Sequence, residues 1–161
     1  VAFAGRCFIE EIPRYKNLPG DTWLKIVKVP GGLHIYPRFV EWFINNSADF
    51  DVGLSPLVNS TFNKCKTDIK FLDYVGIGIL PVLSDIEAYN TVSDINKFAI
   101  LVKDEEWYDS LEKIIIQNDK TIFNNMIEAG KKYLWESRSV EHISKEQYSS
   151  LCSILNISQD N

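Results

Sequence analysis

Two lysines, a threonine and an aspartate occur close together in the sequence, and their side chains could bind an anionic ligand. They are Lys66, Thr67, Lys70 and Asp73. On a helix opening at residue 66, residues spaced four and seven apart share a face, so the lysines and the aspartate would lie together. Thr67 can cap that helix, whose free N–H groups and partial positive charge favour an anion.

This pattern suits a nucleoside diphosphate. The two ammonium groups and the backbone amides would neutralise the phosphates, and the Asp73 carboxylate would accept hydrogen bonds from sugar hydroxyls. The plainer interpretation is a solvated helical face with a weak ion pair, because charged helical faces are common. Both interpretations are open at the level of the residues alone.

The elements that must position these residues alternate along the chain. A helix is expected over 66–77, with Ile69, Leu72, Val75 and Gly76 packing on a sheet, and a loop over 59–63. Strand patterns followed by helical patterns predict a parallel sheet covered on both sides, which binds ligands at the carboxyl ends of its strands. We expect strands at 23–29, 50–54, 80–84 and 98–102, and further helices at 36–45, 104–117 with Asp104 as cap, 120–134 and 144–155.

Composition limits the class of protein. With 161 residues, 45% of them hydrophobic and 24% charged, the chain is expected to form a single globular domain over residues 1–161. A net charge of −5 argues against a general phosphate-backbone binder, so no nucleic-acid partner is predicted. The longest apolar stretch, 75–83, is too short to span a bilayer, which needs about 20 residues.

The cysteines and the start of the chain bear on location. The three cysteines form no CxxC pair, which suits reduced thiols in a reducing compartment. The first residues lack the pattern of a secretory signal, and the chain opens with Val1, so we expect a piece of a longer cytoplasmic protein.

Other candidate groups have simpler interpretations. His34 could act as a base, but no placed carboxylate accompanies it, and Cys65 could act as a nucleophile, but no partner can be named. Asp49 and Asp51 form a DxD pattern that precedes its strand, so Asp49 is interpreted as a turn residue and no metal is expected. The pair Gly31–Gly32 is interpreted as a plain turn.

The segment around the lysines closely resembles bacterial glycosyltransferases of the group 1 kind. The resemblance covers about residues 23 to 135 and is most specific in the central run, which opens with Phe62–Asn63. The matching segments are 36–40, 51–57, 62–74 with Gly78, Ser84–Asp85, and Trp107–Tyr108. Two positions depart from the family pattern: Cys65 stands where the broader family has the first Glu of its Glu-x7-Glu motif, and Pro81 comes one residue late.

The resemblance implies the C-terminal, nucleotide-sugar-binding half of a GT-B fold, a Rossmann-like three-layer α/β/α domain with a parallel sheet. It implies that Lys66, Thr67 and Lys70 contact the donor diphosphate, while Asp73 and Asn63 contact the ribose or the sugar. No metal or cofactor is implied, since lysines and a helix terminus can neutralise the diphosphate. The catalytic residues would lie in an N-terminal domain, so this chain alone is expected to be inactive.

The expected function is therefore donor binding in polysaccharide biosynthesis. The partners would be a nucleotide sugar, a glycan or lipid-linked acceptor, and the missing N-terminal domain, toward which the last helix, 144–155, would pack. A lipid-linked acceptor would place the full-length protein peripherally at the inner membrane. The alternative is a non-catalytic Rossmann-like domain that binds a nucleotide or a protein, and a receiver-like module is disfavoured because no acidic cluster follows the first strands.

Overall fold

In the computed structural model, the residues that can be described are 2–5, 25–28, 31, 35–117 and 119–155. The chain divides into two units, Val1–Asn46 and Ser47–Asn161, and each is described by itself. That they form the single domain expected from the sequence stays a prediction.

The first unit holds a two-stranded sheet and one helix. Strands β1 (Ala2–Gly5) and β2 (Lys25–Lys28) pair in parallel, with Ala2 opposite Lys25. Helix α1 (Tyr36–Asn46) confirms the helix expected over 36–45. Strand β1 was not expected from the sequence.

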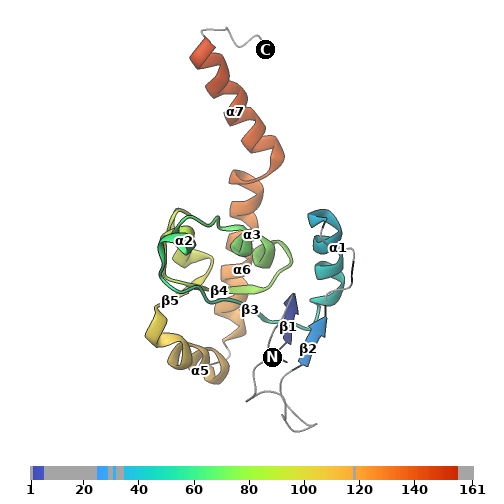
Figure 1. The fold of residues 1–161 in the computed structure, drawn as a ribbon, viewed down its shortest axis with the longest axis vertical. Helices are drawn as coiled ribbons and strands as arrows, with labels where there is room; N and C mark the ends of the chain where they lie inside the picture. Colours follow the sequence, from blue (N-terminus) through green and yellow to red (C-terminus); the bar gives the residue numbers. More distant parts are fainter. Residues whose placement is uncertain (1, 6–24, 29–30, 32–34, 118, 156–161) are drawn as a thin grey trace. The chain divides into compact units, whose positions relative to one another are not determined.

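The second unit is built on a three-stranded parallel sheet (Figure 1). Its strands are β3 (Val52–Ser55), β4 (Leu80–Ser84) and β5 (Ile100–Val102), in that order across the sheet. All five residues of the central strand β4 are buried, as expected for a strand covered on both faces. The strands expected at 50–54, 80–84 and 98–102, and their parallel arrangement, are confirmed.

Helices follow the strands of this second unit. Three of the expected helices form, with shifted ends: α3 (Ile69–Gly76), α5 (Trp107–Gln117) and α6 (Lys120–Ser137). Helix α7 (Val140–Leu155) begins four residues before the expected position, and α4 (Glu87–Asn90) is a short addition. Asp104 does not cap α5, because a 3₁₀ turn occupies 104–106 and precedes the helix.

A short helix also replaces an expected loop. Helix α2 (Thr61–Lys64) overlaps the loop expected over 59–63, and the Ser60 hydroxyl at its start accepts a hydrogen bond from the Asn63 N–H at 3.3 Å. The local capping group is visible in the sequence, but a single helical turn has no periodicity to reveal it.

Two apolar clusters lie on opposite faces of the sheet, because successive residues of a strand point to opposite sides. Leu83 of β4 belongs to the cluster that includes Phe71 and Val75 of α3, and residues of α4 and α6 complete it. Val82 belongs to the other cluster, with Ile114 of α5. Helices therefore pack against both faces of the sheet, and the mixed α/β class with a parallel sheet is confirmed.

No helix in the described residues is long and apolar enough to cross a membrane. The expected strand 23–29 is confirmed at β2, and its remaining residues lie outside the described ranges.

Candidate functional site

The candidate site residues follow the carboxyl end of β3, at the edge of the sheet where α/β proteins bind ligands. Buried hydroxyl groups form hydrogen bonds at this edge of the sheet. The Ser55 and Tyr89 hydroxyls lie 2.6 Å apart, and the Ser84 hydroxyl, at the end of β4, accepts a hydrogen bond from the Leu57 N–H at 2.7 Å. The loop that leaves β3 is thus held against the end of β4.

A second phenol holds α3 against the same strand. The Tyr74 hydroxyl donates to the Leu54 carbonyl oxygen at 2.8 Å. Burial raises the pKa of Tyr74 to about 12, with smaller contributions from Tyr89 and Asp73, and burial also raises the pKa of Tyr89. Both phenols are therefore neutral hydrogen-bonding groups at physiological pH.

Two side chains of helix α2 contact neighbouring segments. The Asn63 amide donates to the Val58 carbonyl oxygen at 2.8 Å, and the Lys64 ammonium lies 3.6 Å from the Glu87 carboxylate of α4. Asn63 was expected to contact ribose or sugar, and the structure places its amide in a hydrogen bond within the loop.

Lys66 and Thr67 lie outside α3, which corrects the expected helix over 66–77. The helix begins at Ile69, and Asp68 is the cap residue, whose carbonyl oxygen accepts hydrogen bonds from the N–H groups of Phe71 and Leu72. Thr67 is therefore not the cap. Lys66 is exposed, and its ammonium lies 5.2 Å from the centroid of the Phe62 ring. The expected placement of Lys66 on one helical face with Lys70 and Asp73 is wrong.

Lys70 and Asp73 do share a face of α3. The ammonium of Lys70 lies 3.1 Å from the Asp73 carboxylate, whose side chain is only 6% exposed. The expected apolar stripe of this helix is confirmed at Val75, which is buried, but Ile69 is exposed, and Phe71, which was not expected in the stripe, is buried.

The strongest ion pair at this helix was missed by sequence reasoning. The Arg138 guanidinium, at the end of α6, binds the Asp68 carboxylate through two bonds of 2.6 and 3.1 Å. The Asp68 side chain is 9% exposed, and this hydrogen bonding raises the pKa of Arg138 above its usual value. Because 70 residues separate the two partners, no local pattern could have revealed the pair.

The remaining candidates contribute little. Cys65 is an exposed free cysteine, and Asp49 lies in a turn, as interpreted from the sequence. Within the described ranges, no group of acidic, histidine or cysteine side chains could hold a metal ion. His34 and Gly32 lie outside the described residues, whereas Gly31 is exposed.

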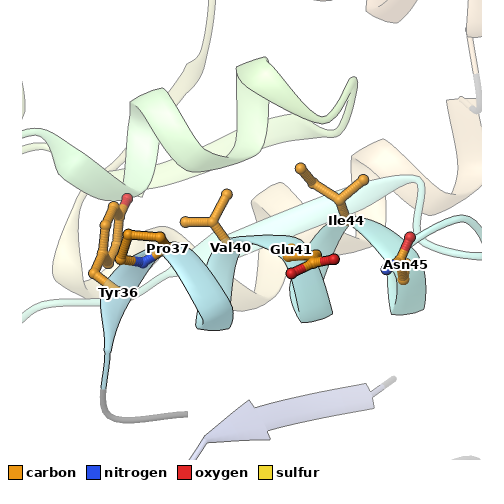
Figure 2. A pocket seen from close by; sticks show the side chains of 6 residues that line it. All are labelled: Tyr36, Pro37, Val40, Glu41, Ile44 and Asn45. Carbon is orange, nitrogen blue, oxygen red and sulfur yellow. The ribbon is translucent and has the colours of Figure 1, made fainter.

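Two surface hollows in the described part of the chain are lined by none of Asn63, Lys66, Thr67, Lys70 and Asp73. One, of about 490 Å³, is lined by α1 alone, and Figure 2 shows the side chains that line it: Tyr36, Pro37, Val40, Glu41, Ile44 and Asn45. The other, of about 410 Å³, is lined by residues at the start of β3 and by residues of α5 and α6, among them Asp51, Ile114 and Lys120. We favour the carboxyl edge of the sheet as the site on chemistry, because its cations follow a strand end.

Comparisons with protein-family models, with curated proteins and with solved structures found no match to this chain. The geometry of the carboxyl edge therefore has to be interpreted from its own chemistry. It combines an exposed ammonium group at Lys66 with those of Lys64 and Lys70, which lie beside the carboxylates of Glu87 and Asp73. Ammonium groups gathered in this way can bind an anion.

Proposed function

We propose that the chain is the donor-binding domain of a glycosyltransferase, binding a nucleoside diphosphate sugar at the carboxyl edge of a Rossmann-like three-layer domain. The observation that carries the proposal is the position of Lys66 and Lys70, which lie in and just beyond the loop from β3 to α3. The resemblance of segment 62–74 to group 1 glycosyltransferases supports the same function, and parallel strands with helices on both faces support half of a GT-B fold.

The two lysines would stabilise the diphosphate as it leaves the sugar. Ammonium groups placed before the reaction stabilise developing negative charge without reorganising. Thr67 would donate its hydroxyl to a phosphate oxygen, and Asp73 would orient Lys70 while accepting a hydrogen bond from a ribose hydroxyl. These positive charges replace a metal ion in the proposed mechanism.

The acceptor would be bound elsewhere in a larger cytoplasmic protein. A glycan or lipid-linked acceptor would meet the donor at an N-terminal domain that also supplies the catalytic residues. Helix α7 exposes Leu151, Ile154 and Leu155, a surface that would pack toward such a domain. The chain alone would then bind a donor without transferring its sugar.

Ligand binding tests this function. Calorimetry and thermal unfolding with UDP-, GDP-, ADP- and dTDP-sugars should identify one nucleotide class that binds. At 100 times its dissociation constant, that ligand should stabilise the fold by about 2.7 kcal/mol.

The variants Lys66→Ala and Lys70→Ala should each weaken binding about tenfold or more, because each removes a charge-assisted hydrogen bond worth about 1.5–3 kcal/mol. Lys132→Ala is the matched control, since this lysine is exposed on α6 beside Glu136. If no nucleotide sugar binds, or if the lysine variants bind as tightly as the control, the donor-binding proposal fails and a protein-binding domain becomes the better interpretation.

A further inference from the structure

Phe62 is an exposed aromatic ring at the candidate site. It lies on α2, between the end of β3 and the start of α3, and it is 76% exposed. In the part of the chain that the structure describes, it stacks on no other aromatic ring, and its neighbour is the Lys66 ammonium at 5.2 Å. Exposed apolar residues are common singly, so this exposure needs further evidence to carry meaning.

The turn that carries the ring has contacts of its own. The Ser60 hydroxyl accepts from the Asn63 N–H, the Asn63 amide donates to the Val58 carbonyl oxygen, and the Lys64 ammonium lies beside the Glu87 carboxylate. The ring is therefore exposed on a hydrogen-bonded helical turn that leads from β3 to α3. A planar ligand that covers it would remove its apolar surface from water.

The chemistry beside the ring limits the class of ligand that could bind there. An ammonium over an aromatic face is favourable on its own and also places a positive charge next to the ring. A ligand that satisfies both groups has a planar apolar part joined to a negative charge. A nucleotide has this combination: its base can stack on a ring, and its phosphates can bind an ammonium.

We propose that Phe62 and Lys66 form a two-part recognition surface for the nucleoside half of the ligand, in which the Phe62 ring stacks on the base and Lys66 binds the adjoining phosphate. This inference rests on the proposed nucleotide-binding function and adds the group that recognises the base. Because every base has a π face, the ring favours nucleotides over other diphosphates and discriminates weakly among bases.

Comparing a nucleoside diphosphate with inorganic pyrophosphate tests the assignment. For the nucleotide found to bind, Phe62→Ala should weaken the affinity about 5- to 100-fold, the effect of losing one stacked base. The affinity of the Phe62→Ala variant for pyrophosphate, which has no base, should stay within about twofold of that of the unaltered chain. Lys66→Ala should weaken the binding of both the nucleotide and pyrophosphate.

Three further variants separate stacking from loop structure. Phe62→Tyr keeps a ring and should retain nucleotide affinity, whereas Phe62→Leu keeps apolar bulk and should lose most of it. Trp135→Ala removes another aromatic side chain, which lies on α6 and is 77% exposed. This control should leave the affinities for the nucleotide and for pyrophosphate unchanged.

The outcomes distinguish this inference from the function on which it rests. If no nucleotide binds to the unaltered chain, the proposed function is wrong, and so is the recognition surface. Nucleotide binding that Phe62→Ala leaves unchanged overturns the recognition surface alone. Equal loss of nucleotide and pyrophosphate also overturns it, because the ring would then only support the loop. Selective loss, with rescue by tyrosine, supports it.

Discussion

At the scale of single residues, hydroxyl groups hold the candidate site together. Ser55, Ser84, Tyr74 and Tyr89 all act at the carboxyl ends of β3 and β4, with hydrogen bonds of 2.6 to 2.8 Å. Within the described residues, no buried side-chain nitrogen or oxygen atom lacks a hydrogen-bond partner. The site edge is therefore held by neutral hydrogen bonds, while the charged groups that could meet a ligand lie outside them.

Tyr74 should make the fold sensitive to alkali. Its pKa is raised from 10 in the unfolded chain to about 12 in the folded one, so the folded state keeps the proton longer. The stability that this proton provides is complete below pH 10 and is lost as the pH rises toward 12. The loss from this residue is about 2 kcal/mol, and Tyr89, with its raised pKa, adds in the same direction.

The variant Tyr74→Phe measures this effect. At pH 7 it should be about 1 kcal/mol less stable than the unaltered chain, because it lacks the hydrogen bond to Leu54. Urea unfolding followed by circular dichroism at pH 8 and pH 11.5 should show this gap closing or reversing, since only the unaltered chain loses the Tyr74 contribution. A gap that stays constant across this range would contradict the assignment.

At the scale of elements, close packing between helices and the sheet sets the position of α3. Gly53 of β3 lies directly against the Tyr74 ring of α3, and Gly130 of α6 lies against Val75 of α3. Both glycines serve a close approach, so α3 is enclosed between β3 and α6. Their effects on stability should differ with the rigidity of the neighbour.

Alanine substitutions at the two glycines should both destabilise the fold, and Gly53→Ala should do so more. A Cβ at Gly53 would lie 2.6 to 2.7 Å from three ring atoms of Tyr74, which is held by its hydrogen bond, so we expect a cost of about 3 kcal/mol. A Cβ at Gly130 would meet Val75 at 2.9 Å, but alanine also favours the helix by about 1 kcal/mol, so the net cost should be about 1 kcal/mol.

Chemical denaturation of the two variants checks this order. Gly76→Ala is the matched control, because a Cβ there would meet no atom within 4 Å. Equal costs at Gly53 and Gly130 would mean that the Tyr74 ring can shift as freely as the Val75 side chain.

Sequence patterns predicted the elements that have strong local signals. The continuous apolar run of β4 and the aromatic periodicity of α1 were sufficient, and both elements appear at the expected residues or within one residue of them. The start of α3 was wrong by three residues, because the polar residues before Ile69 allow either a helix or a loop. Strand β1 was missed, since four small or apolar residues carry no period.

The candidate site was predicted less completely than the fold. Lys70 and Asp73 were correctly placed on one face, because helical spacing fixes their relation. The contact of Lys66 with Phe62 and the pair of Asp68 with Arg138 were missed, since each depends on how the chain turns outside regular structure or on a partner far along the sequence.

At the scale of the whole molecule, the second unit contains both apolar clusters formed by the described residues, and α7 adds little to either. Of the residues in α7, only Cys152 is buried, whereas Tyr148, Leu151 and Ile154 are exposed. We propose that these exposed apolar residues of the 16-residue helix would contact the rest of a larger enzyme.

Charged substitutions on α7 should distinguish a free surface from a buried one. The double variant Leu151→Asp, Ile154→Asp should change the free energy of unfolding by less than about 1 kcal/mol, because both side chains are already in water. It should also lower any concentration-dependent association in analytical ultracentrifugation.

Cys152→Asp is the matched substitution at the buried position of the same helix, and it should cost about 2 kcal/mol or more. If the double variant destabilises the fold as much as Cys152→Asp does, the exposed side of α7 is part of the core after all.

The bond between Asp68 and Arg138 also has a consequence for how the chain is made. A ribosome releases the amino-terminal part first, so residue 68 leaves the exit tunnel well before residue 138, which completes its ion pair 70 positions later. Until then, the Asp68 carboxylate at the start of α3 has no guanidinium partner, and it stays hydrated in water. The contact that ties the start of α3 to the end of α6 therefore forms late in synthesis, and a chain that stops before Arg138 would lack it.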